Sequence, residues 1–471
     1  MTSPSHSPDP GVPAPASVPV PRPRTRLSAR VWATLLVVGL TGQVAWAVEN
    51  MYLNVYLYQT VTSDPTATAT MVAASAVTAT VAAALLGTAS DRWGRRRELI
   101  AIGYLLWGLS TAAFGVVGVD ALARLVGPVS AVGATVAAIV VLDCVMSFLG
   151  AGANDAAFSA WVTDVTDPTN RGRVDATLAV LPLVAMLVVF GALDGLTRSG
   201  RWSLFFGIVG ATTSIVGTAS WFLVREAPSH APRGADTEKR RREGPDGTAG
   251  YLRSLVALLR PAEVRANPGL YWALLVWCVL GTAAQVFLPY LIIYIQYYLR
   301  IDGYAVVLGI VLTVASALSV AGGRVIDRVG KLRAQVPAVV LFAAGLGLTF
   351  LARSTVTVVL AGILMIAAMM LSTATTSAIV RDHTPADRAG TLQGLRMVAA
   401  TLVPMVVGPY IGAAVIVGSQ ATYVELGRVR QVPTPSIFLV AALIAALALI
   451  PIALLRRSDA RMMETREADI P

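Results

Sequence analysis

Three acidic residues interrupt long apolar stretches of the chain: Glu49, Asp143 and Asp155. A charged side chain inside hydrocarbon is costly, so an acid retained there usually has a function. A buried carboxyl group is uncharged for part of the time, and its proton can be released and taken up again. We therefore expect these acids to be proton sites, with Glu49 as the main one. The alternative is structural: Glu49 bonds a neighbouring helix, and Asp155 only supports helix packing.

Amide and aromatic side chains surround Glu49 in the sequence. Glu49, Tyr52 and Tyr56 follow helical spacing and are predicted to share one face, with Asn50 and Asn54 on the adjacent face. Amides and acids hydrogen-bond hydroxyl groups, and aromatic rings stack on the apolar face of a sugar, so this combination suits a polyol. The candidate substrate-binding residues are Gln43, Trp46, Asn50, Tyr52, Asn54, Tyr56, Asn154, Gln285, Tyr290 and Tyr294.

Other polar residues in the apolar stretches are expected to have ordinary roles. Asp194 lies near a predicted outer boundary and is expected to be solvated. Ser372, Thr373, Thr375 and Thr376 are expected to hydrogen-bond their own helix backbone. The sequence contains no phosphate-binding loop, no metal-ligand cluster and only three histidines. We therefore expect no cofactor, no bound metal and no enzyme activity.

The composition is that of a membrane protein. The chain is 55% hydrophobic and 14% charged, whereas soluble domains are about 25% charged. Many apolar runs exceed the roughly 18 residues of a membrane span, and they are continuous rather than alternating, which disfavours a barrel. We predict an all-α polytopic membrane protein with twelve transmembrane helices. Their expected ranges are 30–59, 69–90, 98–118, 134–165, 174–196, 202–224, 268–299, 304–322, 334–353, 356–380, 391–418 and 434–455.

A charged motif occurs twice, about half the chain length apart. Residues 87–95 and 323–331 both fit G-x-x-x-D-R-x-G-[RK], and their starts are 236 residues apart in a chain of 471. Such a repeat indicates a duplicated unit. We predict two pseudo-symmetric six-helix bundles at 30–224 and 268–455. The remaining segments are predicted to be a disordered cytoplasmic tail at 1–29, a cytoplasmic linker at 225–267 with a candidate surface helix at 251–260, and a cytoplasmic tail at 456–471.

The placement of positive charge predicts the orientation in the membrane. The net charge of +10 could indicate a nucleic-acid partner. However, all but seven of the 37 lysines and arginines fall on one predicted side. This asymmetry predicts that both termini are cytoplasmic in the plasma membrane, and it explains the net charge by contact with the lipid bilayer, without nucleic acid. The seven exceptions are Arg124, Arg198, Arg201, Arg300, Arg353, Arg428 and Arg430.

The two motif copies within twelve predicted spans resemble the major facilitator superfamily. Residues 87–97 look like its signature loop between helices 2 and 3, and 323–333 look like the counterpart between helices 8 and 9. The resemblance implies a cytoplasmic gate in which Asp91 accepts hydrogen bonds from a helix start and the arginines pair with Asp164. The alternative for the arginines is anchoring to lipid headgroups. The implied gate residues are Gly87, Asp91, Arg92, Gly94, Arg95, Asp164, Arg171, Gly323, Asp327, Arg328, Gly330, Lys331 and Arg396.

Two further stretches resemble sugar-transporting branches of that family. Residues 43–49 look like the opening helix of proton-coupled sucrose and disaccharide transporters. Residues 156–166, with Asn170–Gly172, look like the glycoside–pentoside–hexuronide cation symporters. Sodium-coupled members usually carry paired acids on helix 2, and 69–90 contains none. Coupling to protons is therefore expected, and sodium is disfavoured.

These features lead us to expect a monomeric secondary transporter that works by alternating access. The preferred hypothesis is proton-coupled uptake of a neutral sugar or glycoside, because no lysine or arginine is expected deep in the membrane to bind an anionic substrate. One alternative is a proton-antiporting exporter of drugs or metabolites. A second is a membrane sensor that uses the same scaffold without transporting.

Overall fold

The computed structural model describes residues 27–93, 95–167, 169–225, 257–258, 260–384, 389–425 and 428–468. Within these ranges the chain is almost entirely helical, and eleven helices are long and apolar enough to cross a membrane. The helix α4 (Arg96–Ala113) takes the third of the twelve expected places. It has only 18 residues and begins with three charged ones, so it is less apolar than the others.

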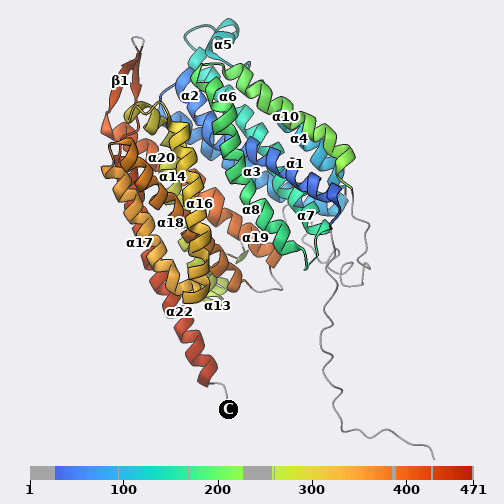
Figure 1. Ribbon diagram of the computed structural model, residues 1–471, viewed down its shortest axis with the longest axis vertical. Coiled ribbons are helices and arrows are strands. Elements are labelled where there is room, and N and C mark those ends of the chain that lie inside the picture. The colour runs from blue at the N-terminus through green and yellow to red at the C-terminus, as the bar shows by residue number, and fades with distance from the viewer. Residues whose placement is uncertain are drawn as a thin grey trace, which may run out of the picture.

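The first half contains membrane helices 1 to 6 (Figure 1). Ser28 caps the first of them, because its Oγ accepts a hydrogen bond from the Val31 amide at 3.3 Å. In order, these helices are α1 (Ala29–Ala47) with η1 (Val48–Tyr52) and α2 (Leu53–Thr60); α3 (Pro65–Trp93); α4; α6 (Ala131–Gly150) with η2 (Ala151–Phe158) and α7 (Ser159–Val165); α8 (Arg171–Val188) with η3 (Val189–Leu193) and α9 (Asp194–Arg198); and α10 (Trp202–Leu223). The short helix α5 (Val119–Val126) lies between α4 and α6.

The second half contains membrane helices 7 to 12. A capping box between Ser354 and Thr357 starts helix 10. In order, the elements are α13 (Pro261–Ala266); α14 (Pro268–Phe287) with η4 (Leu288–Tyr290), α15 (Leu291–Ile293) and η5 (Tyr294–Tyr298); α16 (Tyr304–Val329); α17 (Lys331–Leu351); α18 (Thr355–Asp382); α19 (Ala389–Met397) with η7 (Val398–Leu402) and α20 (Val403–Ser419); strands β1 (Thr422–Glu425) and β2 (Arg428–Gln431); and α21 (Ser436–Leu447) with α22 (Leu449–Ala468).

Several predicted boundaries differ from the structure. The predicted tail at 456–471 begins as a continuation of α22, which stays helical to Ala468 and projects from the end of the molecule in Figure 1. Most of the predicted tail at 1–29 and of the linker at 225–267 lies outside the described residues, as does most of the candidate surface helix. Strands β1 and β2, which were not expected, form an antiparallel hairpin between helices 11 and 12.

In the described part of the chain, five of the membrane helices contain a π-helical segment: η1, η2, η3, η5 and η7. In a π turn the backbone hydrogen bond closes five residues back, as the Leu53 amide does on the Val48 carbonyl. The side chains that follow are therefore rotated relative to a continuous α-helix. Such segments are frequent at functional sites, and three of them, η1, η2 and η5, carry predicted site residues.

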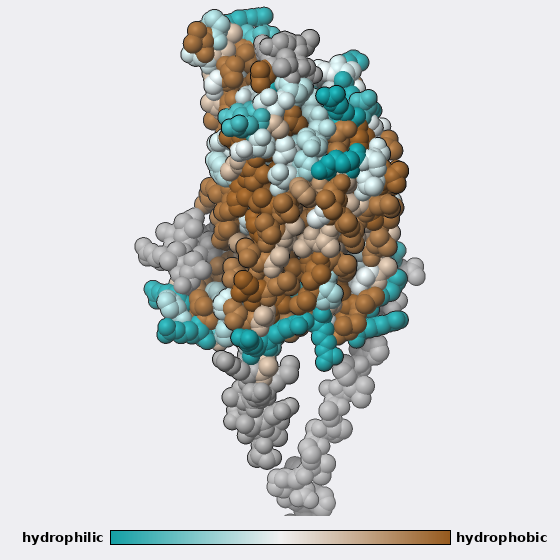
Figure 2. Space-filling model, turned by 90° about the vertical axis from the view of Figure 1, so that its left-hand side faces the viewer, coloured by the Kyte–Doolittle hydropathy of each residue, from teal (hydrophilic) through white to brown (hydrophobic). Residues whose placement is uncertain are grey.

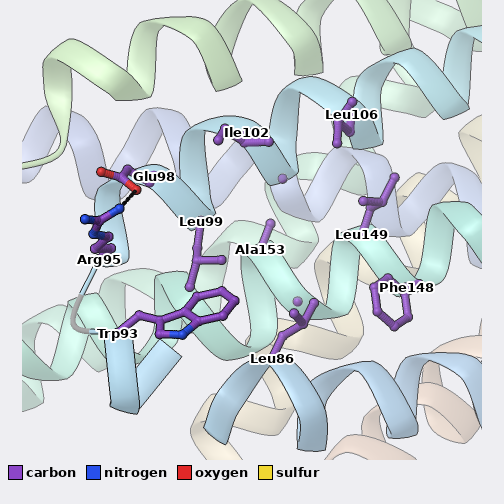
Figure 3. Close-up of a pocket in the computed structure, with 12 residues that line it drawn as sticks. Leu86, Trp93, Arg95, Glu98, Leu99, Ile102, Leu106, Phe148, Leu149 and Ala153 are labelled. Carbon is purple, nitrogen blue, oxygen red and sulfur yellow. Dashed lines mark hydrogen bonds and ion pairs between the residues drawn. The ribbon is translucent and has the colours of Figure 1, made fainter. Parts of the chain in front are cut away.

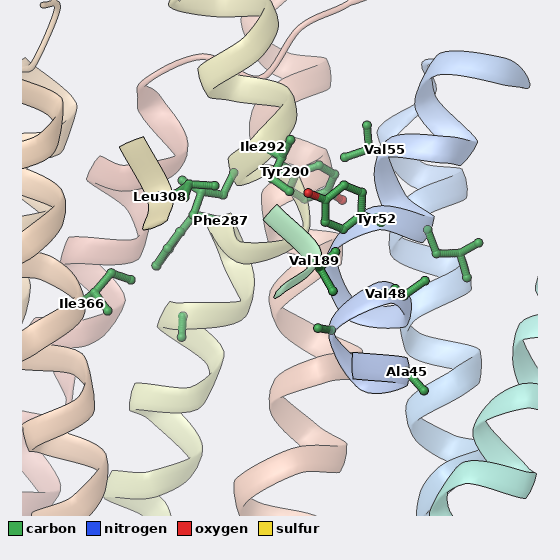
Figure 4. Packing of buried hydrophobic residues seen from close by; sticks show 14 of the residues in the cluster. Ala45, Val48, Tyr52, Val55, Val189, Phe287, Tyr290, Ile292, Leu308 and Ile366 are labelled. Atoms are coloured by element: carbon green, nitrogen blue, oxygen red, sulfur yellow. The ribbon is translucent and has the colours of Figure 1, made fainter. Parts of the chain in front are cut away.

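A single hydrophobic core cluster extends through both halves. Where the halves meet, Val48 and Tyr52 of η1 approach Val189 of η3 and Tyr290 of η4 (Figure 4). We call the end of the molecule with α5 and the β1–β2 hairpin the hairpin end; it is uppermost in Figure 1. The opposite end, with the loops at 93–96 and 329–331, is called the arginine-loop end.

The outer surface matches the demands of a bilayer. Figure 2 shows a broad band of hydrophobic side chains across the middle of one face, with hydrophilic residues at both ends. Large apolar side chains that soluble proteins would bury are exposed along these helices, including Leu348, Leu351 and Leu443. This distribution places the hydrocarbon of the membrane around the middle of the two halves.

Candidate functional site

A cavity of about 320 Å³, called the central cavity below, lies between the two halves. Gln43, Trp46 and Asn50 reach it from membrane helix 1, and Gln285 reaches it from α14 of the other half. The structure thus brings together four of the predicted substrate-binding residues. A mainly apolar wall with a few polar groups is the usual composition of a small-molecule site. The remaining wall consists of Ala47, Met51, Val72, Pro182, Met186, Leu288 and Pro289.

A pair of buried acids lies inside the first half, behind the wall that Asn50 forms. Glu49 Oε1 accepts a hydrogen bond from Ser147 Oγ of α6 at 2.5 Å. Asp143, one turn away on α6, is only 1% exposed and interacts electrostatically with Glu49. Ser75 of α3 is a hydrogen-bonding neighbour of the Asp143 carboxyl. Within the described residues, Glu49 Oε2 and Asp143 Oδ1 have no hydrogen-bond partner. Two such carboxyl groups have spare positions for a proton.

Asp155 differs from the other two acids because it lies at the surface of its membrane-spanning helix instead of being enclosed by neighbouring helices. Asn154 Nδ2 donates a hydrogen bond to Asp155 Oδ1 at 2.8 Å, and Trp46 is a second hydrogen-bonding neighbour. Asn154 in turn accepts a hydrogen bond from the Tyr104 hydroxyl at 2.7 Å. Asp155 therefore links the cavity-lining Trp46 to the interior of the first half, and it also interacts electrostatically with Glu49.

Tyr52 and Tyr56 do not share the face of Glu49. The Tyr52 hydroxyl donates to Asp194 Oδ1 at 3.0 Å, whereas the Tyr56 hydroxyl donates to backbone carbonyls at the end of helix 3. The expected common face relied on α-helical spacing, and the π segment η1 interrupts that spacing. Neither tyrosine lines the central cavity.

Three other predicted substrate contacts are engaged by partners within the protein. Asn54 Nδ2 donates to the Asn50 carbonyl at 2.8 Å. The Tyr294 ring stacks on Tyr298 with centroids 5.3 Å apart. The Tyr290 hydroxyl contacts the carbonyls of Pro409 at 2.9 Å and of Pro65, in the other half, at 3.0 Å. The expected backbone bonding of the hydroxyls on helix 10 is confirmed for Ser372, Thr375 and Thr376.

The prediction that Asp194 is solvated is wrong, since its side chain is 1% exposed. Its Oδ1 accepts hydrogen bonds from Tyr52 at 3.0 Å and from Tyr304 of the second half. Its Oδ2 pairs with Arg198 Nε at 2.9 Å. We call these four residues the Asp194 cluster. The only sequence signal for it was the i,i+4 spacing of Asp194 and Arg198.

The β1–β2 hairpin extends this closure across the hairpin end. Arg430 of β2 donates to the carbonyls of Tyr58 at 2.9 Å and Gln59 at 3.2 Å, where helix 1 ends. The Tyr58 hydroxyl donates back to the Gln431 carbonyl at 2.6 Å. The hairpin belongs to the second half and these partners belong to the first, so it joins the halves on that side.

At the arginine-loop end, each ion pair that the described part of the chain shows for a predicted gate residue lies within a single half. Asp164 Oδ2 is 3.2 Å from Arg96 Nε, and Arg95 pairs instead with Glu98 at 3.3 Å. In the second half, Lys331 pairs with Asp382 at 2.6 Å. These pairs strengthen each half separately, in contrast to the hydrogen bonds between halves at the hairpin end.

The remaining predicted gate residues differ in how far the structure describes them. Gly94 and the side chains of Asp91, Arg92 and Asp327 lie outside the described part. Gly330 adopts φ +95°, a conformation that favours glycine at the start of α17. Gly87 and Gly323 have room for a side chain, so neither marks a tight helix contact. Arg171 contacts Thr166, Arg396 lies over the Trp277 ring, and Arg328 is exposed.

A separate cavity of about 740 Å³ lies within the first half alone, between α3, α4, α6 and η2 (Figure 3). Arg95, Glu98 and Trp93 form one end of it, and most of its wall is apolar. Because none of the described residues of the second half lines it, this cavity lacks the two-sided wall that alternating access requires. The central cavity is therefore the better candidate site.

Comparison with known proteins identifies the family. The family model of the Major Facilitator Superfamily matches residues 32–369 and 307–469. No curated protein matches this chain.

Solved structures give the same fold. A mutant of the nucleoside transporter NupG is similar with a TM-score of 0.68 and 12% identity, covering 90% of this chain and 99% of that one. A D-xylose-proton symporter gives 0.65 and 15%, covering 90% and 97%. The xylose transporter XylE from E. coli, in a partially occluded inward-open conformation, gives 0.61 and 16%, also covering 90% and 97%. The predicted fold of twelve helices in two halves is confirmed.

Proposed function

The chain belongs to the major facilitator superfamily and is a secondary transporter of a small solute, and we propose that it couples transport of a neutral sugar or glycoside to protons. One observation carries the proposal. Glu49 and Asn50 are neighbours in one π segment, yet Asn50 lines the central cavity while Glu49 joins the buried acid pair. When substrate binding shifts Asn50, the adjacent Glu49 should shift with it, and this would link the substrate site to the proton site.

The central cavity supplies the groups that a hydroxyl-rich ring needs. Gln43, Asn50 and Gln285 provide amide donors and acceptors, and Trp46 provides an aromatic face. Lysine and arginine do not line the cavity, which favours a neutral solute over an anion. Its volume of about 320 Å³ is near the lower end for ligand sites and suits a small molecule. Three amides favour a polyol over the lipophilic substrates of a drug exporter.

Coupling would use the acids that adjoin the cavity. Asp155 is exposed and can exchange a proton with solvent, whereas Glu49 and Asp143 are buried and can hold one away from water. A potential of 100 mV supplies about 2.3 kcal/mol for each charge that crosses the membrane, which can drive accumulation of a neutral solute. Sodium is disfavoured because helix 2 offers no acid within 69–90.

We propose that the arginine-loop end faces the cytoplasm of a cell bounded by the plasma membrane, with the transporter acting as a monomer. The asymmetry of lysine and arginine supports this orientation. The structure then represents a state in which the Asp194 cluster and the hairpin close the outer side. Opening that side while closing the arginine-loop end would complete alternating access. The xylose and nucleoside transporters of similar fold support a sugar-containing solute.

Transport by the purified protein in proteoliposomes tests the proposal. With an imposed proton gradient, wild-type protein should accumulate a sugar or glycoside, and Glu49→Gln should abolish accumulation while still exchanging labelled for unlabelled solute. Asp120→Asn is a matched control, because Asp120 is exposed on the short helix α5 and lines neither the central cavity nor the acid pair. Normal accumulation by Glu49→Gln would exclude the proposed proton site. Proton flux driven by lipophilic cations, with none driven by sugars, would favour an exporter, and no flux at all would favour a sensor.

A further inference from the structure

A second cavity, of about 180 Å³, lies in the second half beside the central cavity. The two cavities meet at Gln285 and Leu288, which line both. We call the second one the side cavity. It is formed by helices 7, 9, 10 and 11 only, with Trp277, Phe342 and Met369 among its walls.

The walls of the side cavity differ in chemistry from those of the central cavity. Aromatic, aliphatic and thioether groups dominate, and these bind apolar rings well. Ser372 also lines the side cavity, but its hydroxyl already donates to the Ala368 carbonyl at 2.7 Å. The amide of Gln285 stands at the junction, so polar groups are concentrated toward the central cavity.

Packing around the side cavity fixes its shape. Arg396 lies 5.0 Å from the Trp277 ring centroid and holds that ring in place. A side chain at Gly281 would come within 2.8 Å of Pro404, so helices 7 and 11 are already in close contact there. A Cβ at Gly408 would lie 2.5 Å from Gln285 Cβ, which places helix 11 directly behind the junction residue. The side cavity is thus a preformed space between closely packed helices.

Building on the proposed function, we infer that the substrate is a glycoside with an apolar, ring-sized aglycone. The sugar occupies the central cavity, where Gln43 and Asn50 contact its hydroxyls. The aglycone occupies the side cavity between Trp277 and Phe342. The glycosidic oxygen then lies near Gln285, the polar residue that the two cavities share.

The experiment compares methyl and phenyl glycosides of the same sugars, using glucosides, galactosides and xylosides as probes for binding to the purified protein. The phenyl glycoside should bind about tenfold more tightly than its methyl counterpart, because burying an aromatic ring adds apolar contact. Thr373→Phe should fill the side cavity, since the exposed Thr373 side chain lines it. This variant should remove the preference for phenyl and leave the affinity for the methyl glycoside unchanged.

Thr212→Phe is the matched control, because Thr212 is exposed on α10 and lines neither cavity. It should keep the preference for phenyl. Equal affinity of the methyl and phenyl glycosides for wild-type protein would overturn this inference and leave the proposed function intact. So would an unchanged preference in Thr373→Phe, given a folded variant that still binds the methyl glycoside. If no glycoside binds, the proposed function is wrong and the inference fails with it.

Discussion

Tyr304 donates a hydrogen bond to Asp194 across the boundary between the two halves of the transporter. The acceptor is buried and also binds Tyr52 and Arg198 from its own half. One of the contacts that close the hairpin end is thus made by a carboxylate that the first half holds in position and the second half contacts through one hydroxyl. This arrangement gives the closed state a specific polar bond that must break before the end can open.

Removing that hydroxyl should favour opening at the hairpin end. Tyr304→Phe keeps the ring but loses a hydrogen bond to a charged group, worth about 1.5–3 kcal/mol, so the ratio of open to closed molecules should rise at least tenfold. Spin labels on the two halves at the hairpin end would report the change as a larger fraction of long distances. Tyr298→Phe, on the partly exposed end of helix 7, is the control. An unchanged distance distribution would show that Tyr304 does not hold this end closed.

The β1–β2 hairpin should help to keep the hairpin end closed through Arg430, whose side chain donates to two backbone carbonyls of helix 1. Arg430→Lys keeps the charge but cannot donate to the Tyr58 and Gln59 carbonyls in the same geometry. Losing about 1 kcal/mol should raise the open fraction several-fold. Reaction of a cysteine placed in the loop at 61–64, after helix 1, with a membrane-impermeant reagent would measure it, after replacement of the free thiols Cys144 and Cys278. Arg124→Lys on α5 should have no effect, and equal reactivity in both variants would rule out a role for the hairpin.

Alanine substitution should reduce substrate affinity at Asn50 and thermal stability at Asn54, although the two residues are only one turn apart. Asn50 is exposed to the central cavity, whereas Asn54 is 1% exposed and donates to the Asn50 carbonyl. Asn50→Ala should weaken binding of the proposed sugar substrate about tenfold with little change in melting temperature. Asn54→Ala should lower the melting temperature and leave binding within about twofold. Binding calorimetry and thermal unfolding separate the two effects, and equal losses of affinity would contradict the assignment of Asn50 alone to the cavity.

His383 should make thermal stability depend on pH. Burial alone would lower the pKa of His383, but its bond with Asp459 and its contact with the Ile379 carbonyl outweigh burial, and the pKa is raised above its usual 6.5. Both ring nitrogens face acceptors, Nε2 at 3.0 Å and Nδ1 at 2.9 Å, so the charged ring is the better partner. A raised pKa gives stability that is complete below pH 6.5 and is lost as the pH rises through the folded value.

The detergent-solubilised protein should therefore melt about 2 °C higher near pH 6 than near pH 8.5, through the contact between α18 and α22. His383→Gln should reduce this difference, because glutamine does not titrate. Asp459→Asn tests the partner and should reduce it as well. If both variants keep the full pH dependence, another group is responsible.

Much of the fold follows from features that a sequence states directly. The paired motifs at 87–95 and 323–331 predicted two halves, and continuous apolar runs predicted the helices. The acids and amides of the site were also visible, because polar residues stand out in apolar surroundings. Gln43, Asn50 and Gln285 meet in one cavity, as their chemistry suggested.

The orientation of side chains was harder to predict, for a physical reason. Helical spacing assumes an unbroken α-helix, and η1 breaks it between Glu49 and Tyr56. Tyr52 consequently points to Asp194 rather than beside Glu49. Asp194 itself was misjudged because its partner Tyr304 lies 110 residues away in the sequence. Contacts between the halves depend on how the halves pack, and local sequence patterns carry no information about that packing.

The π segments also determine what kinds of sequence change this transporter tolerates. A π turn contains one more residue than an α turn, because its backbone hydrogen bond joins residues five apart instead of four. In η1 this bond joins the Leu53 amide to the Val48 carbonyl. Deleting a single residue there would restore an ordinary helix and rotate everything after it, carrying Tyr52 away from Asp194. Substitutions in these turns alter one contact, whereas changes of length alter a whole helix end. Gaps in an alignment of relatives should therefore avoid η1 even where its residue types vary freely.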